Sequence, residues 1–236
     1  MEEQQRLLAE VLDLFARRFD KRAVLRGGMV LRILGCERLT NDLDYVFVPY
    51  RSKKDIAGAV LDALQTLPGV TLSHTLNSKC LRVTVTRGGV SVQVEAKTAM
   101  QVDAKTLSTG SLAQPFNLPP RLIRVVDYPV ALADKMAAWN ERRLMRDLYD
   151  IWFFLRMGIR PDEPTLLRRL KKPAYSRLVK PVDHFKGKSA DDFYDFLQEH
   201  ANGLTDEVIA GELKDYLRAD EMAGLTMRFR AELAKL

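Results

Sequence analysis

The chain has 236 residues, of which 47% are hydrophobic and 29% charged, proportions that are typical of folded globular proteins and exclude disordered and fibrous classes. No stretch is long and uncharged enough for a signal peptide or a membrane span, and two cysteines are too few for a thiolate metal cage, so we expect a cytoplasmic protein without membrane contact. The formal net charge of +6 favours polyanionic partners such as nucleic acid.

The N-terminal region predicts a helix, a strand, a glycine turn and a second helix. Apolar residues at helical spacing indicate an amphipathic helix over residues 4–19. A short apolar run at 23–25 indicates a strand, and it leads directly into Gly27 and Gly28. A second helical pattern covers 29–34 and is expected to end at the glycine that follows.

Four strand patterns follow, with one helix among them. Residues 43–48 are apolar except for Asp44, which indicates a buried strand, and a helix is expected near 52–67. Three further segments are rich in β-branched or alternating residues, so we expect them to pair as an antiparallel meander. These segments are 70–76, 80–86 and 90–95.

The second half of the chain is predicted to be helical. A stretch rich in proline and glycine at 108–120 predicts a loop, and only 122–126 has a strand pattern after it. Strong helical patterns then cover 129–143 and 146–157, and further helices are expected up to the C-terminus. The whole chain is therefore predicted to be an α+β core over 1–125 followed by a helical domain over 126–236.

The segment 26–44, RGGMVLRILGCERLTNDLD, combines features that phosphoryl chemistry uses. Gly27 and Gly28 let the backbone approach a phosphate, and the helix after them offers free N–H groups and the positive end of its dipole. Asp42 and Asp44 are two residues apart on a strand, so their side chains leave the same face and can converge on one hard cation. The alternative for such a pair is a solvated Asp-x-Asp at a strand or turn.

Arg38 and Thr40 supply a cation and a hydroxyl beside the two aspartates. The order of glycine pair, helix and RLTNDLD resembles the first motif of the nucleotidyltransferase superfamily, in particular its AbiEii/AbiGii toxin type with the MenT-like toxins. That resemblance implies a polymerase-β-like core with a mixed or antiparallel sheet and an NTP bound with Mg²⁺ or Mn²⁺. It implies that Asp42 and Asp44 are catalytic metal ligands, and that the two glycines, Arg38 and Thr40 lie near the phosphates.

Two other positions bear on this site. Met29 stands where the superfamily often has serine or threonine, so a hydroxyl contact to phosphate is missing. The superfamily also uses a third acidic residue on a neighbouring strand, and Glu95 is the candidate metal ligand here. Ser91, Gln93 and Glu95 share the polar face of the strand 90–95. The alternative for Glu95 is an exposed glutamate at the end of a strand.

The segment 133–155, ADKMAAWNERRLMRDLYDIWFFL, resembles the later motifs of the AbiEii type in order and spacing. Lys135 and Arg142 are seven residues apart, so both project from one helical face, while Met136 and Trp139 pack inward. Two cations on one face beside a triphosphate would neutralise the charge that develops during transfer. The resemblance implies that the helical domain contributes these cations to the site.

Asp147 and Asp150 are three residues apart and share a helix face. The resemblance favours an aspartate here as a catalytic residue that orients or deprotonates the attacking hydroxyl, and it leaves open which of the two acts. The alternative is that Arg146 and Asp150 form a surface ion pair, Asp147 favours the helix start and Lys135 is solvated.

The basic stretch 168–188 has Tyr175 and Phe185 among its cations, a pattern that can bind an RNA backbone and stack a base. A solvated helical face is the alternative. A small-molecule transferase has no need of such a stretch. The three histidines show no metal-ligand spacing, so no role is assigned to them.

The preferred hypothesis is a toxin of a toxin–antitoxin system that transfers a nucleoside monophosphate from an NTP to an RNA acceptor, the 3′ end of tRNA, with release of pyrophosphate. A cognate antitoxin protein is the expected partner. One alternative is nucleotide transfer to a small molecule such as an aminoglycoside. Another is a non-catalytic RNA-binding or antitoxin-binding protein with a degenerate pocket, for which Met29 is the supporting departure.

Overall fold

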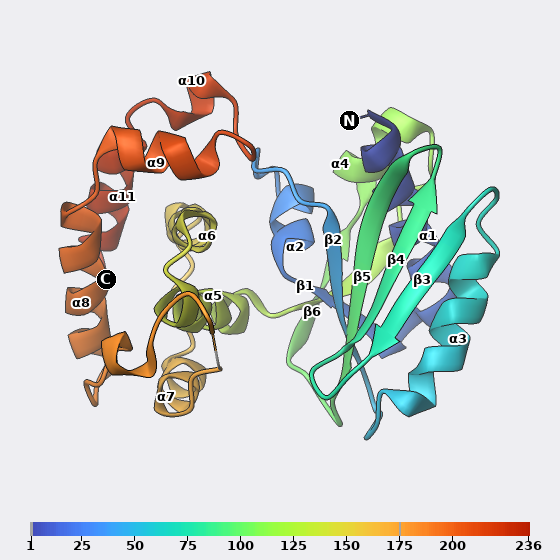
Figure 1. Cartoon of the computed structure of the whole chain (residues 1–236), viewed down its shortest axis with the longest axis horizontal. Helices are drawn as coiled ribbons and strands as arrows, with labels where there is room; N and C mark the ends of the chain where they lie inside the picture. Colours follow the sequence, from blue (N-terminus) through green and yellow to red (C-terminus); the bar gives the residue numbers. More distant parts are fainter. Residues whose placement is uncertain (1, 175) are drawn as a thin grey trace. The chain divides into compact units, whose positions relative to one another are not determined.

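The structure is a computed structural model that describes residues 2–174 and 176–236. The chain divides into two compact units, Met1–Asp127 (unit 1) and Tyr128–Leu236 (unit 2). Unit 1 combines a sheet with helices, whereas the regular structure of unit 2 is helical (Figure 1). Within the described ranges, no helix has both the length and the apolar run that crossing a bilayer requires. The predicted α+β class is confirmed.

Unit 1 is built on a seven-stranded mixed sheet with the order β3-β4-β5-β2-β1-β7-β6. The pairs β1–β7 and β2–β5 are parallel, and the other neighbours are antiparallel. The predicted antiparallel meander is confirmed as β3-β4-β5. The strands are β1 (Ala23–Arg26), β2 (Asp42–Phe47), β3 (Thr71–Leu76), β4 (Leu81–Arg87), β5 (Val90–Thr98), β6 (Ala104–Ser108) and β7 (Leu122–Val126).

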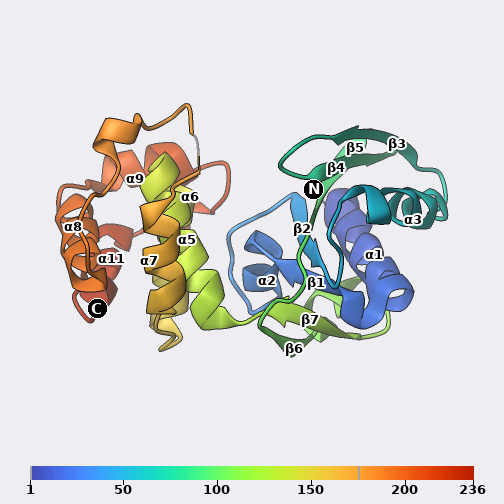
Figure 2. The same cartoon turned by 90° about the horizontal axis from the view of Figure 1, so that it is seen from below.

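Helices cover both faces of this sheet. α1 (Glu2–Phe19) and α3 (Lys54–Gln65) lie together on one face, and the short α2 (Gly28–Ile33) lies on the other, as the turned view shows (Figure 2). The remaining helical segments of unit 1 are short, namely η1 (Asp20–Arg22), α4 (Gly110–Ala113) and η2 (Gln114–Phe116). The predicted first helix, glycine turn and second helix are therefore confirmed, with ends that differ by one or two residues.

An aromatic cluster holds α1 on its face of the sheet. Phe15 packs on Tyr45 with ring centroids 4.8 Å apart, and Phe19 meets Phe47 at 5.0 Å. Successive side chains of a strand point to opposite faces. Because Tyr45 and Phe47 of β2 point into this core, Asp42 and Asp44 of the same strand point to the other face, the one that α2 occupies.

The region 104–120 has more regular structure than the sequence predicts. The sequence pattern does not predict β6, and α4 and η2 lie within 108–120, where the proline and glycine content predicts a loop. β6 is an edge strand that pairs only with β7, and its sequence, AKTLS, contains a single large apolar residue. An edge strand needs little apolar surface, so its sequence carries only a weak strand pattern.

Unit 2 is organised around α6, whose residues Ile151–Leu155 are all buried. A helix that is apolar around its circumference belongs inside a bundle. α5 and α11 pack against α6, α7 packs against α5, and α8 packs against α11. The helices are α5 (Tyr128–Arg142), α6 (Met145–Arg156), α7 (Glu163–Lys171), η3 (Pro181–Asp183), α8 (Ala190–Asn202), α9 (Asp206–Leu213), α10 (Ala219–Met222) and α11 (Leu225–Leu233).

Candidate functional site

Gly27, which joins β1 to α2, lies directly against the carboxylate of Asp44. Its backbone angles are φ 75° and ψ −157°, a region that is open essentially to glycine alone. A Cβ atom placed on Gly27 would overlap with Asp44 Oδ2 and lie 3.1 Å from Asp44 Cγ. The β1–β2 register explains this contact, because it pairs Asp44 with Arg26, the residue before the glycine. The glycine turn and the second aspartate of the motif therefore lie in direct contact at one site.

Gly28, the first residue of α2, is covered by Arg38 and Thr40. A Cβ atom on Gly28 would lie 2.7 Å from Arg38 Nη2 and 3.2 Å from Thr40 Oγ1. Arg38 is only 6% exposed, and its Nη1 donates to the Leu39 carbonyl at 3.1 Å. Thr40 Oγ1 accepts a long hydrogen bond of 3.4 Å from the backbone N–H of Asp42. The cation and the hydroxyl expected near the phosphates thus lie beside the glycine backbone.

The parallel register of β2 and β5 places Asp42 beside Gln93 and Asp44 beside Glu95, so all four side chains share a face. Glu95 Oε1 accepts hydrogen bonds from Arg82 Nη2 at 2.6 Å and Nε at 2.9 Å, and the interaction raises the pKa of Arg82. Gln93 Nε2 also donates to Glu95 Oε1 at 3.2 Å. Glu95 is therefore bound to Arg82, and its role as a third metal ligand stays a prediction.

Asp42 and Asp44 provide a donor set that fits a hard divalent cation. Both side chains are half-buried on one strand face, and adjacent carboxylates repel each other unless a cation lies near them. Across residues 2–174 and 176–236, no cluster of three or more His, Cys, Asp and Glu side chains is arranged to hold a metal. Mg²⁺ commonly takes one or two carboxylates together with water and substrate phosphate oxygens. The residues therefore suit a cation that is shared with a phosphate, and they do not form an all-protein cage.

Met29 and the length of α2 limit which groups can contact a phosphate here. The Met29 side chain is fully buried, with 0% exposure, so it packs in the core of unit 1. α2 has only six residues, which makes its dipole a minor source of positive charge. Backbone N–H groups of the glycine turn, together with Arg38 and Thr40, remain as the candidate phosphate donors.

Unit 2 contains a cluster of four charged side chains from α5 and α6. Asp147 is 1% exposed and Asp150 0% exposed. Arg142 clamps Asp147 with two hydrogen bonds, 2.7 Å from Nη2 and 3.0 Å from Nε. Lys135 Nζ lies 2.5 Å from Asp150 Oδ2 and 4.0 Å from Asp147 Oδ1. Two cations thus balance two buried carboxylates.

The pattern of α5 explains how the cations reach this cluster. Lys135 and Arg142 are two turns apart and both contact α6 residues, while Met136 and Trp139 are 0% and 4% exposed. The predicted inward packing of the two apolar residues is confirmed. The alternative of a surface pair between Arg146 and Asp150 with a solvated Lys135 is wrong, because Asp150 is buried and its carboxylate is bonded to Lys135. Arg146, which that alternative paired with Asp150, points its guanidinium to the hydroxyl of Tyr216 at 3.5 Å.

Sequence reasoning missed two buried polar residues at the end of α5. Asn140 is 0% exposed, and its Oδ1 accepts from the backbone N–H of Phe185 at 2.9 Å. Glu141 is 6% exposed, and its Oε1 accepts from the backbone N–H of Ala174 at 2.8 Å. The helical spacing predicts that Asn140 is buried, because Asn140 lies four residues after Met136 on the apolar side of the helix. Tyr175, which was expected to stack a base, lies outside the described residues.

Comparisons with known proteins bear on the whole chain. MenT4, a nucleotidyltransferase toxin from Mycobacterium tuberculosis H37Rv, is similar with a TM-score of 0.61 at 18% identity, covering 99% of this chain and 83% of its own. JHP933 from Helicobacter pylori is similar with a TM-score of 0.55 at 13% identity, covering 99% of this chain and 90% of its own. At these identities the likeness shows a shared fold. No curated protein matches the chain in sequence.

The family model described as "Nucleotidyl transferase AbiEii toxin, Type IV TA system" matches residues 6–222. This range includes the glycine turn, RLTNDLD and the Lys135 to Asp150 segment. The resemblance that the motifs indicated is confirmed. The chain therefore belongs to the AbiEii family of nucleotidyltransferase toxins.

Proposed function

We propose that this protein binds an NTP at the Gly27–Asp44 contact and transfers the nucleoside monophosphate to the 3′ end of an RNA, with tRNA as the acceptor. The observation that carries the proposal is the overlap that any Cβ on Gly27 would make with the Asp44 carboxylate. Bare backbone next to a carboxylate on a strand is what a phosphate and its cation need at close range. Membership of a nucleotidyltransferase family supports the reaction class.

In this proposal the residues of unit 1 hold the triphosphate. Asp42 and Asp44 would hold Mg²⁺ or Mn²⁺, which supplies charge neutralisation at the phosphate oxygens. Gly27 and Gly28 carry no side chain of their own, so their backbone N–H groups can come close to a phosphate. Arg38, fixed by burial and by its bond to Leu39, supplies a permanent positive charge, and Thr40 supplies a hydroxyl donor.

Lys135 and Arg142 are proposed to stabilise phosphate charge in the same reaction. Their contacts support a positioning role for the two aspartates: Asp147 holds the guanidinium of Arg142 in a fixed plane, and Asp150 holds Lys135 Nζ at 2.5 Å. A cation that is already ordered loses less entropy when a phosphate arrives. That Asp147 or Asp150 contacts the attacking hydroxyl stays a prediction.

The acceptor hydroxyl would attack the α-phosphorus of the NTP. A new bond forms from the hydroxyl oxygen to that phosphorus, the bond to the bridging oxygen breaks, and pyrophosphate leaves with the electron pair. The hydroxyl proton passes to solvent or to a carboxylate. The charge of +6 and the basic stretch 168–188 support a polyanionic acceptor. The toxin–antitoxin description of the family supports a cognate antitoxin protein as a partner.

The proposal is tested by incubating the purified chain with total RNA, divalent cation and each labelled NTP in turn. Label at the 3′ end of tRNA, with pyrophosphate released in equal amount, is the expected result. Label that enters an aminoglycoside and is not competed by tRNA would replace the RNA acceptor with a small molecule. If none of the four NTPs gives binding heat in calorimetry, the alternative of a non-catalytic protein with a degenerate pocket, which Met29 supports, would hold instead.

A further inference from the structure

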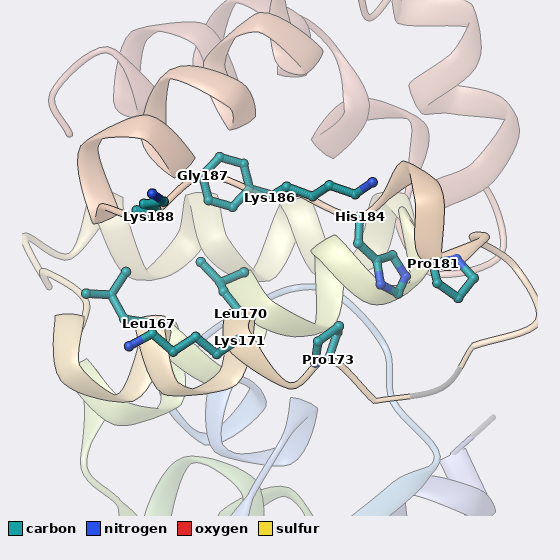
Figure 3. A pocket seen from close by; sticks show the side chains of 10 residues that line it. Leu167, Leu170, Lys171, Pro173, Pro181, His184, Lys186, Gly187 and Lys188 are labelled. Carbon is teal, nitrogen blue, oxygen red and sulfur yellow. The ribbon is translucent and has the colours of Figure 1, made fainter.

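A cavity of about 580 Å³ in unit 2 plays no part in the transfer chemistry proposed above. One wall comes from α7 and the residues that follow it, and the other comes from residues 181–188 (Figure 3). The volume lies within the range of sites that bind small molecules. The cavity lies within the basic stretch 168–188, which the sequence marks as a candidate RNA-binding region.

His184 is an unpartnered polar side chain in this wall. It is 8% exposed, and within the described part of the chain neither Nδ1 nor Nε2 has a hydrogen-bond partner. Its ring extends from the 181–188 segment toward the wall that carries Pro173 (Figure 3). Buried polar groups in proteins are almost always paired. A neutral imidazole offers one donor and one acceptor, which matches the polar edge of a nucleobase.

The rest of the lining suits a flat ring. Leu167 and Leu170 project from α7, and Pro173 follows them on the same wall, while Pro181 belongs to the opposite wall. Phe185 of the 181–188 segment also lines the cavity. Apolar and aromatic surfaces of this kind stack on a base regardless of its identity, because every base has a π face. The walls therefore favour a planar heterocycle with polar groups at its edge.

Three lysines give the cavity a positive rim. Lys171 comes from the end of α7, and Lys186 and Lys188 come from the opposite segment, all three exposed. None of the ten described residues that line the cavity is acidic. Lysines at the edge of an apolar cavity attract a ligand that carries phosphate next to its ring. A planar heterocycle with an adjacent phosphate is a nucleotide.

Both walls are held by residues at the end of α5 and directly after it. Asn140 accepts from Phe185 N at 2.9 Å, and Arg143 Nη2 donates to the Asp183 carbonyl at 3.1 Å, which fixes the 181–188 wall. Glu141 accepts from the backbone N–H of Ala174 at 2.8 Å, which fixes the wall after α7. Because all three anchors are hydrogen-bonded and Asn140 and Glu141 are also buried, the two walls are positioned before any ligand arrives.

We infer that this cavity binds one ribonucleotide unit of the RNA acceptor, with the base between the two walls and its edge on His184. The inference rests on the proposed RNA acceptor. A free mononucleotide has the same chemistry, so an experiment has to separate a nucleotide within an RNA strand from a free NTP.

The first test observes the imidazole nitrogens of the full chain by NMR. The chain has only three histidines, His74, His184 and His200, so single substitutions assign their signals. A short single-stranded oligoribonucleotide is expected to shift the His184 signals and to leave those of His74 and His200 in place. No shift of His184 at saturating oligoribonucleotide, or a shift produced by NTPs alone, would overturn the inference. The readout does not depend on catalysis, so a chain that binds RNA at His184 but transfers nothing would refute only the proposed function.

The second test removes the ring nitrogens. His184→Phe keeps a flat ring and eliminates two unpartnered buried atoms, so the melting temperature is expected to stay the same or rise. The Kd for the oligoribonucleotide is expected to rise roughly tenfold, because an edge contact to the base is lost. An unchanged Kd in a folded variant would contradict the role of His184.

The third test removes the rim charges in a matched pair of variants. Lys171→Ala/Lys186→Ala/Lys188→Ala is expected to weaken RNA binding and to lower the slope of log K against log salt by up to about 2, at roughly 0.7 for each phosphate contact. Lys172→Ala/Lys180→Ala removes two exposed lysines of the same stretch that do not line the cavity. If each lysine removed cost the same RNA affinity in both variants, the lysines would attract RNA only diffusely. That result would overturn the role of the rim lysines as specific phosphate contacts.

Discussion

The two aspartate pairs of this protein lie in contrasting surroundings. Asp42 and Asp44, on a strand of unit 1, are half-buried, and Asp44 lies against a glycine where no side chain fits. Asp147 and Asp150, on a helix of unit 2, are almost fully buried and bonded to a lysine and an arginine. Similar spacing in the sequence therefore produces two different kinds of site.

The difference teaches how to separate ligand-binding carboxylates from those that organise other side chains. A half-buried carboxylate next to bare backbone can be reached by a phosphate or a cation from solvent. A carboxylate that is buried with a cation is satisfied within the fold, and removal of either partner leaves an uncompensated charge. Substitutions in unit 1 are therefore expected to change activity more than stability, and those in unit 2 to change both.

The largest effect is expected for Asp44→Asn, which keeps the shape of the side chain and removes its charge. Nucleotide transfer is expected to fall roughly a thousandfold or more, because the divalent cation loses a ligand. The free energy of unfolding is expected to stay unchanged or rise slightly, since repulsion with Asp42 is relieved. Asp62→Asn on the exposed side of α3 is the matched control and should keep the wild-type rate. A wild-type rate in Asp44→Asn at equal stability would refute the site.

Asp150→Ala is expected to lower both the rate of transfer and the stability, with a smaller effect on the rate than Asp44→Asn. The variant leaves the half-buried Lys135 without its 2.5 Å partner, so the free energy of unfolding in denaturant is expected to drop by about 3 kcal/mol. The double variant Lys135→Met/Asp150→Ala should recover much of that stability without recovering transfer. Stability that is not recovered in the double variant would show that Asp150 does more in the fold than pair with Lys135.

Gly27→Ala is expected to lower transfer roughly a hundredfold, because the new methyl group displaces the Asp44 carboxylate. Gly35→Ala is the matched control, since Gly35 also has a positive φ of 91° but no atom within 4 Å of a built Cβ. That control should lose about 1 kcal/mol of stability from backbone strain and keep its activity. Equal activity loss in both variants would mean that strain, and not the contact with Asp44, is responsible.

The smallest effect is expected for Tyr45→Phe. Tyr45 is 3% exposed, burial raises its pKa, and its hydroxyl has no partner among the described residues. Removing the hydroxyl is expected to raise the free energy of unfolding by about 1 kcal/mol and to leave transfer unchanged, because the ring faces α1. Tyr50→Phe, whose hydroxyl accepts from Arg22 at 3.3 Å, should not be stabilised. A destabilised Tyr45→Phe would reveal a partner for the buried hydroxyl.

Much of unit 1 was predictable because its patterns are local. The apolar runs 23–25 and 43–48, the glycine pair and the two-residue spacing of the aspartates predict the strands, the turn and the shared face of the aspartates from neighbouring residues alone. Glu95 shows where this reasoning ends. Its place beside Asp44 follows from the parallel pairing of β5 with β2, and its bond to Arg82 follows from the pairing of β5 with β4.

The sequence by itself determined most of the helices and strands, the glycine turn and the chemistry of the two motifs, because periodicity and backbone freedom act over a few residues. Only the tertiary structure decided the partners: Asp44 against Gly27, Asp150 with Lys135, and His184 in a cavity wall without a hydrogen bond among the described residues. The first two are contacts between separate segments of the fold. Their geometry depends on packing, which no local pattern contains.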